Sequence, residues 1–177
     1  MLDNSPANAY AVLTGDNSEL LSRWSKSGEV GAMPGAADFL NAVDALGVSI
    51  FYVTNRRENL REDTMHNMKA LNFPQVDEVH TVFRSGEGSK DPRFKRIAES
   101  FDVVVYLGDS AQDFPVEIYG KGLTERNAIF DSARELFGEK YILLPNPIYG
   151  HWLNVSTGKT PEEQHKSKID AMRIWRP

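Results

Sequence analysis

The feature that most constrains the fold is a regular alternation of short apolar runs with amphipathic helical stripes. The runs are rich in β-branched and aromatic residues and predict strands at residues 48–54, 79–83, 102–107 and 141–144. Apolar residues at helical spacing fall between them, at 39–46, 94–101 and 129–137. Strands joined by helices in this way run parallel with right-handed crossovers. The pattern therefore predicts an α/β fold: a doubly wound, Rossmann-like parallel sheet with helices on both faces.

Helix boundaries agree with this interpretation. Asp91-Pro92 and Thr160-Pro161 each match an N-cap residue followed by proline in the first helical position. Thr160 and Glu163 also fit a capping box. A chain of 177 residues, 41% of them hydrophobic, can bury a substantial core. We expect a single domain over residues 1–177.

Composition narrows the classes of function. The net charge is −5 and the basic residues are scattered, which argues against binding a nucleic acid polymer. A small phosphorylated partner needs only a local basic pocket. The chain has no cysteine, which excludes thiolate nucleophiles and zinc-thiolate sites. The absence of a G-x-S-x-G elbow and of paired histidines argues against a serine hydrolase or a zinc enzyme. No apolar run approaches the roughly 18 residues of a membrane span, and residues 1–6 lack a signal-peptide pattern.

The residues that follow each strand are the ones to inspect, because ligands of doubly wound sheets bind beyond the carboxyl ends of the strands. Asp109 and Asp113 are four residues apart after the third strand, and Gly108 permits a tight turn. Two such carboxylates outline a site for Mg²⁺, which prefers oxygen ligands. The alternative is that Asp109 caps the following helix and Asp113 is a solvated carboxylate of its first turn.

Phosphate donors are available on two other loops. Thr54 ends the first strand, and its hydroxyl and the next amide can donate to a phosphate oxygen, with Asn55 and Arg56 adding donors. Lys90 can neutralise both a phosphate and a neighbouring carboxylate. The alternatives are a strand end leading into an N-cap and a surface lysine in a loop. The spacing of a phosphate-cradling G-x-x-x-x-G-K-[ST] loop is absent.

Two aromatic residues stand beyond the last strand. Tyr149 and Trp152 lie where their rings can stack on a nucleoside or aryl leaving group. For Trp152 the alternative is a buried anchor of the loop. The sequence leaves the oligomeric state open.

Taken in order, Thr54-Asn55-Arg56, Lys90, and Gly108-Asp109 with Asp113 resemble motifs two, three and four of the haloacid dehalogenase (HAD) superfamily. The flanking segments narrow the resemblance to the class C (subfamily IIIB) acid phosphatases, the bacterial cell-envelope lipoprotein type. These segments are residues 2–6, 32–36, 51–56 and 144–152. The similarity covers essentially the whole chain. It implies a small helical cap at about residues 5–34 on a core of residues 35–177.

The resemblance also implies an activity, a magnesium-dependent phosphomonoesterase that works through an aspartyl-phosphate. Thr54 would hold the transferring phosphoryl group and Lys90 would stabilise its charge. Asp109 would bind Mg²⁺, with Asp113 as a ligand or as a partner behind it. Localisation in the periplasm or at the outer membrane is implied if a signal peptide lies upstream.

One departure from the family pattern concerns the nucleophile. The family carries D-x-D-x-T on a strand immediately upstream of its L-D-N-S-P segment, whereas these residues begin at Met1-Leu2-Asp3. By that pattern Asp3 lies past the strand end and cannot replace either aspartate. We expect that Met1 is an internal methionine, that the first core strand is missing, and that the chain as given is inactive. The alternative is a non-catalytic phosphoester-binding or storage protein on the same scaffold.

Overall fold

The computed structural model describes residues 1–14, 19–86, 88–146, 160, 162–163 and 166. Its helices are α1 (Ser5–Thr14), α2 (Leu20–Lys26), α3 (Ala36–Ala45), α4 (Arg61–Ala70), α5 (Asp91–Ala98) and α6 (Leu123–Ser132). Its strands are β1 (Leu2–Asp3), β2 (Gly31–Ala32), β3 (Tyr52–Arg57), β4 (Thr81–Arg84), β5 (Tyr106–Gly108) and β6 (Tyr141–Leu143). Short 3₁₀ turns are η1 (Glu58–Leu60), η2 (Ala111–Asp113) and η3 (Arg134–Leu136). None of the described helices is long and apolar enough to cross a membrane.

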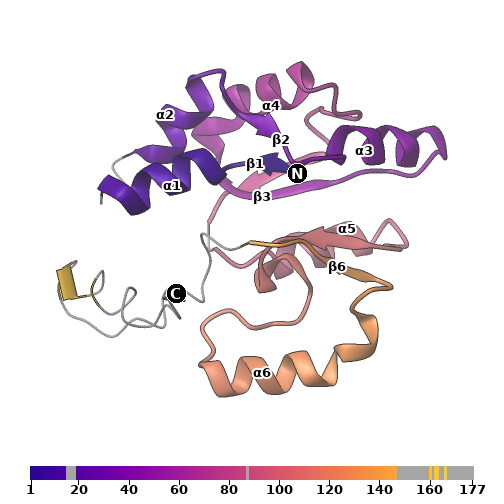
Figure 1. Cartoon of the computed structure of the whole chain (residues 1–177). Coiled ribbons are helices and arrows are strands. Elements are labelled where there is room, and N and C mark those ends of the chain that lie inside the picture. The colour runs from indigo at the N-terminus through magenta and orange to yellow at the C-terminus, as the bar shows by residue number, and fades with distance from the viewer. Residues whose placement is uncertain (15–18, 87, 147–159, 161, 164–165, 167–177) are drawn as a thin grey trace, which may run out of the picture.

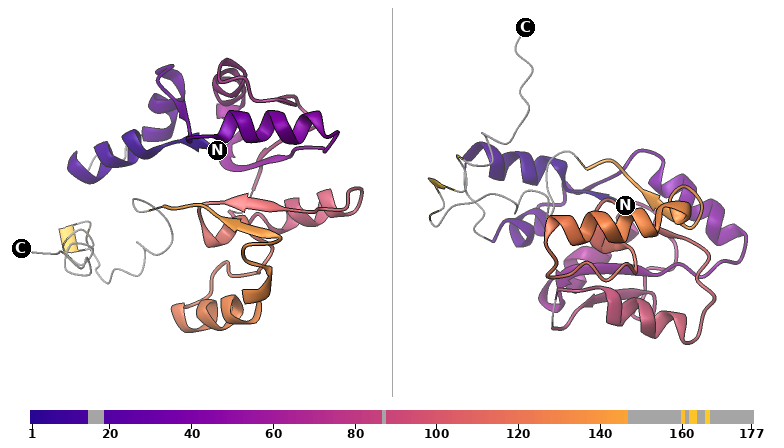
Figure 2. Two further views of the ribbon diagram at one scale, coloured as in Figure 1. Left: turned by 45° about the vertical axis from the view of Figure 1, so that its right-hand side comes forward. Right: turned by 90° about the horizontal axis from the view of Figure 1, so that it is seen from below.

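The strands form two parallel pairs, and helices connect them. β3 pairs with β4 and β5 with β6, both in parallel, while β1 and β2 form a short antiparallel pair. The predicted α/β class is therefore confirmed. In Figure 1 the part of the chain with α1 to α4 and β3 lies above the part with α5, α6 and β6. The left view of Figure 2 keeps the same division.

A cleft separates the two parallel pairs. It has a volume of about 410 Å³, and most of its lining comes from residues 48–53, residues 102–107 and the apolar sides of α3 and α5. The predicted strands at 48–54 and 102–107 are shorter in the structure, because residues 48–51 and 102–105 lack a ladder partner among the described residues. Val104, in the apolar run predicted as a buried strand of the sheet, is 62% exposed.

Each parallel pair has its own apolar cluster. Beside β3 and β4 the buried residues are Ala36, Leu40, Ile50, Met68, Phe73 and Val76. Beside β5 and β6 an aromatic cluster joins Phe94, Tyr106, Phe114, Phe137 and Tyr141 through ring centroids 5.3 to 5.7 Å apart. Such tilted and edge-to-face ring pairs contribute beyond the area they bury. The two parallel pairs therefore pack against separate apolar clusters on either side of the cleft.

Two predicted helix boundaries are wrong by a residue or more. The third apolar stripe is not one helix, because α6 ends at Ser132 and Phe137 lies beyond η3. Helix α5 begins at Asp91, so Lys90 rather than Asp91 is its N-cap residue. By contrast, the Thr160 and Glu163 capping box is confirmed: each backbone N–H donates to the other side chain, at 3.2 and 3.1 Å.

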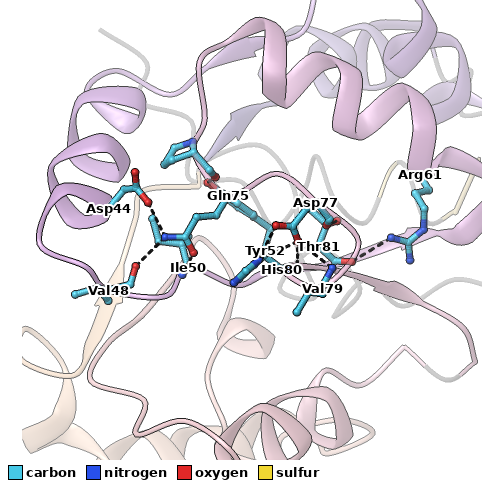
Figure 3. Close-up of polar contacts among 11 residues, drawn as sticks. Asp44, Val48, Ile50, Tyr52, Arg61, Gln75, Asp77, Val79, His80 and Thr81 are labelled. Carbon is cyan, nitrogen blue, oxygen red and sulfur yellow. Dashed lines mark hydrogen bonds and ion pairs between the residues drawn. The ribbon is translucent and has the colours of Figure 1, made fainter.

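A polar network fixes the approach to β3 (Figure 3). The Gln75 side chain accepts from the Ile50 N–H at 2.9 Å and donates to Asp44 Oδ1 at 2.6 Å and to the Val48 carbonyl at 2.9 Å. The Tyr52 hydroxyl donates to the Pro74 carbonyl at 2.7 Å, and burial raises the pKa of this hydroxyl. These bonds satisfy backbone groups that have no strand partner, so residues 48–52 hold an extended path along the cleft.

Candidate functional site

The strand β3 is irregular where its functional residues lie. Val53 pairs with Val82 and Arg57 with Arg84, so the ladder register shifts between these pairs. Thr54, Asn55 and Arg56 occupy the irregular stretch. The sequence predicted that the strand ends at Thr54, whereas in the structure it continues to Arg57. Bulges of this kind occur next to active sites, where they redirect side chains.

Thr54 keeps a donor available in this bulge. Its Oγ1 accepts a hydrogen bond from the Arg56 backbone N–H at 3.1 Å. A hydroxyl that accepts through its oxygen retains its own proton for donation. The local geometry is thus compatible with a phosphate donor at Thr54.

Arg56 is directed into the protein. Only 6% of this residue is exposed, and its guanidinium donates to Ser25 Oγ, Thr64 Oγ1 and Asn4 Oδ1 at 2.7, 3.0 and 2.9 Å. These contacts join β3 to α2, to α4 and to the segment before α1. The structure shows Arg56 as a buried residue that connects these elements. Its expected contact with the substrate stays a prediction.

Lys90 and Asp113 form a nearly buried ion pair. Lys90 Nζ lies 2.5 Å from Asp113 Oδ1, and the two side chains are 13% and 12% exposed. The other carboxylate oxygen of Asp113 accepts from the backbone N–H groups of Asp109 and Ser110, both at 3.0 Å. The alternative of a surface lysine at position 90 is therefore wrong, and so is that of a solvated Asp113.

The cap of the turn after β5 falls on other residues than the sequence suggested. Ser110 is the N-cap residue of η2, and Ser110 and Asp113 form a capping box. Asp109 therefore does not cap this turn. The Asp113 carboxylate binds Lys90 and two backbone N–H groups, so it holds both the loop and Lys90 in place.

Asp109 is a candidate metal ligand of this loop. Asp113 is committed to Lys90 and the backbone, so its carboxylate binds a cation only if those bonds are given up. No group of three or more potential metal-ligating side chains occurs in the described part of the chain. Because Mg²⁺ takes few protein oxygens and completes its shell with water and phosphate, Asp109 fits as one ligand of a larger set.

Gly108 makes the close approach of this loop to β5 possible. A Cβ at position 108 would overlap the Asp113 side chain. We expect Gly108→Ala to lower the free energy of unfolding by about 1 to 3 kcal/mol, as overpacking does, and to displace Asp113 from Lys90. Urea denaturation measures the change. Gly86→Ala, where the added Cβ meets no atom within 4 Å, is the matched control and should be near neutral. Equal stability of the two variants would contradict the crowding at position 108.

Sequence reasoning missed Arg93. This arginine is 8% exposed and lies in the first turn of α5. It donates to the Thr54 carbonyl at 2.5 Å, to Asn55 Oδ1 at 2.5 Å and to the Ser89 carbonyl at 3.0 Å. A cation in the first turn opposes the helix dipole, and that was the one signal in the sequence. The predicted Tyr149, and Trp152 with it, lie outside the described residues.

Three loops thus converge at the carboxyl edges of the strands. Arg93 joins the Thr54 bulge to the residue before Lys90, and Lys90 joins that loop to Asp113. The edge combines hydroxyl and amide groups, a cation and a pair of carboxylates. A parallel α/β fold with this edge belongs to the class of proteins that bind their ligands beyond the carboxyl ends of the strands.

Comparison with known proteins specifies the family. The family model described as HAD superfamily, subfamily IIIB (acid phosphatase), matches residues 1–152. The class C acid phosphatase of Bacillus anthracis superposes with a TM-score of 0.87 at 31% identity, covering 99% of this chain and 76% of that one. A structure of the Bacillus anthracis class C acid phosphatase with tungstate bound gives a TM-score of 0.88 at the same identity and coverage. The chain belongs to the subfamily IIIB acid phosphatases of the HAD superfamily.

Proposed function

We propose that this chain provides most of a magnesium-dependent phosphatase of small phosphomonoesters, such as nucleotides or aryl phosphates. We propose further that the 177 residues alone are inactive. A strand carrying D-x-D-x-T completes the active enzyme, and no D-x-D sequence occurs in these residues. A periplasmic or outer-membrane location is part of the same proposal.

The observation that carries the proposal is the cleft between β3 and β5. Each of these strands pairs on one side only among the described residues, so unpaired backbone groups of both face the same apolar space. Met1, Lys90 and Asp113 are all among the residues that line it. The N-terminus is marked beside β1, in the upper part of the chain, in Figure 1 and in the left view of Figure 2. A parallel strand in this cleft whose carboxyl end joins Met1 brings its last residues beside Lys90 and Asp113.

The contacts of Asp3 also support the proposal that the nucleophile lies outside these residues. It lies in β1, paired with Gly31, and its Oδ1 accepts from the Ser5 N–H at 2.8 Å. This carboxylate thus caps α1, which argues against a role as nucleophile.

The residues of this chain have defined tasks in the proposed reaction. Thr54 and Asn55 orient the phosphoryl group, and the Lys90 ammonium neutralises its charge. One aspartate of the added strand attacks phosphorus while the bond to the leaving oxygen breaks, and the second gives that oxygen a proton. Water then hydrolyses the aspartyl-phosphate and releases phosphate. Asp109 would help to hold Mg²⁺, which supplies positive charge next to the phosphate oxygens.

The test compares this chain with an extended protein, defined as these residues preceded by an apolar strand that ends in D-x-D-x-T. We expect the extended protein to hydrolyse an aryl phosphate and to lose activity in EDTA, while the 177 residues alone show no turnover. An extension with asparagine at both aspartate positions is the matched control and should fold without activity. Turnover by the 177 residues that survives repurification and disappears in Thr54→Ala would refute the proposed inactivity. A folded but inactive extended protein that binds phosphate would favour the non-catalytic alternative.

A further inference from the structure

Arg93 is the residue whose contacts the proposed reaction leaves unexplained. Its guanidinium donates to the Thr54 carbonyl and to Asn55 Oδ1, both at 2.5 Å, and to the Ser89 carbonyl at 3.0 Å. The first two acceptors belong to the β3 bulge, and the third directly precedes Lys90. One planar group therefore ties together the two loops that carry the phosphate donors. Arginine suits this task because its donors form a rigid fork.

The contact with Asn55 also sets the direction of that amide. Because Oδ1 accepts from Arg93, the Nδ2 end of the amide is directed away from the guanidinium. Asn55 then offers donors rather than an acceptor on its outer side. A phosphate, whose oxygens are acceptors, requires that orientation.

The charge of Arg93 is poorly compensated. All three of its acceptors are uncharged oxygens, and within the described ranges Arg93 forms no ion pair with a carboxylate. Burial lowers the pKa of the guanidinium, and the nearby cations Arg84 and Arg96 lower it further. A buried cation without a counter-ion favours an anion nearby. Arg93 does not line the cleft between the two parallel pairs, so it acts on that anion through its neighbours.

We propose that Arg93 is a positioning residue of the phosphate site. It locks the Thr54–Asn55 bulge to the Lys90 loop and thereby fixes the spacing and direction of the donors that meet the phosphoryl group. The inference rests on the proposed function and deepens it by naming the residue that assembles the site.

The kinetic test uses the extended protein with Arg93→Lys, which keeps the charge but loses the fork. We expect kcat to fall by about 100-fold with a smaller change in KM, as for a misplaced catalytic group. Arg96→Lys is the matched control, because Arg96 is an exposed arginine of the same helix, and its kcat should stay within about twofold.

A double-mutant cycle separates positioning from general destabilisation. Asn55→Ala removes an acceptor and leaves Arg93 in place, so it is the variant to use should Arg93→Lys not fold. We expect Asn55→Ala to lower kcat by itself, and Arg93→Lys to lower it much less in that background than in the wild type. Independent, multiplying losses, or an Arg93→Lys protein with normal turnover, would overturn the inference.

Binding of inorganic phosphate, measured by calorimetry, distinguishes the two proposals. If Arg93 positions the donors, Arg93→Lys in the extended protein weakens phosphate binding by about tenfold or more. This holds whether or not the extended protein without that change hydrolyses a phosphate ester. An extended protein whose phosphate binding weakens in Arg93→Lys but which hydrolyses nothing would refute the proposed function alone. If the extended protein is active and Arg93→Lys changes neither its phosphate affinity nor its kcat, this inference alone is refuted.

Discussion

Asp109→Asn in the extended protein is expected to lower kcat/KM by about 100-fold or more, the upper end of the losses seen when the surroundings of a metal are altered. Asparagine keeps the shape of the side chain and removes its charge. Asp113 cannot take over, because its carboxylate is held by Lys90 and by two backbone N–H groups. Steady-state kinetics over a range of Mg²⁺ concentrations measures the effect, and excess Mg²⁺ should restore activity only in part.

The matched control for this variant is Asp131→Asn, the same change at an α6 residue that forms an exposed ion pair with Arg134 of η3. Its activity and metal requirement should equal those of the wild type. Near-normal turnover of Asp109→Asn, or activity that EDTA leaves unchanged, would show that the loop after β5 is not the metal loop.

Lys90→Met is expected to reduce both activity and stability. Removal of the cation leaves developing charge on the phosphoryl group unopposed, which should cost about 100- to 1,000-fold in kcat. It also leaves Asp113, 12% exposed, without its partner, and breaking a buried pair costs about 3 to 5 kcal/mol of unfolding free energy. Kinetics and urea denaturation measure the two effects.

Two further variants separate these effects of Lys90. In the double variant Lys90→Met with Asp113→Asn, stability should recover in part because the unpaired charge is gone, while activity should stay low. Lys95→Met is the control, since Lys95 pairs with Glu117 at the exposed surface and should be near neutral. A Lys90→Met protein with wild-type turnover would remove Lys90 from the catalytic machinery.

How far the sequence predicts the site depends on the kind of residue. Lys90 and Asp113 were expected to act near a phosphate and a cation, and they meet in an ion pair. Asp113 was predictable from its place in the loop after a strand, because parallel strands end at one edge of a sheet, whereas Lys90 was selected as a cation in the loop before a helix. The division of labour between Asp109 and Asp113 was not predictable. It depends on which of the two carboxylates binds Lys90 and the backbone N–H groups of the loop. Asp109 and Asp113 are only four residues apart, so the sequence does not distinguish them.

Arg56 and Arg93 show the same limit more sharply. In sequence both are polar residues beside a functional loop, and only Arg56 was expected at the substrate. In the structure both are buried and donate to partners on other elements. Local sequence carries no information about such partners, because Ser25 lies 31 residues from Arg56 and Thr54 lies 39 residues from Arg93.

By itself, the sequence determined the α/β class and the order of α3, β3, β4, α5, β5, α6 and β6 along the chain. Periodicity and turn residues encode these features locally. Tertiary structure alone decided that β3 and β5 stand on opposite sides of an apolar cleft and that Thr54 lies in a bulge. It also decided that one buried arginine joins the two donor loops. These features arise from hydrogen bonds and packing between segments distant in the chain, which no local pattern specifies.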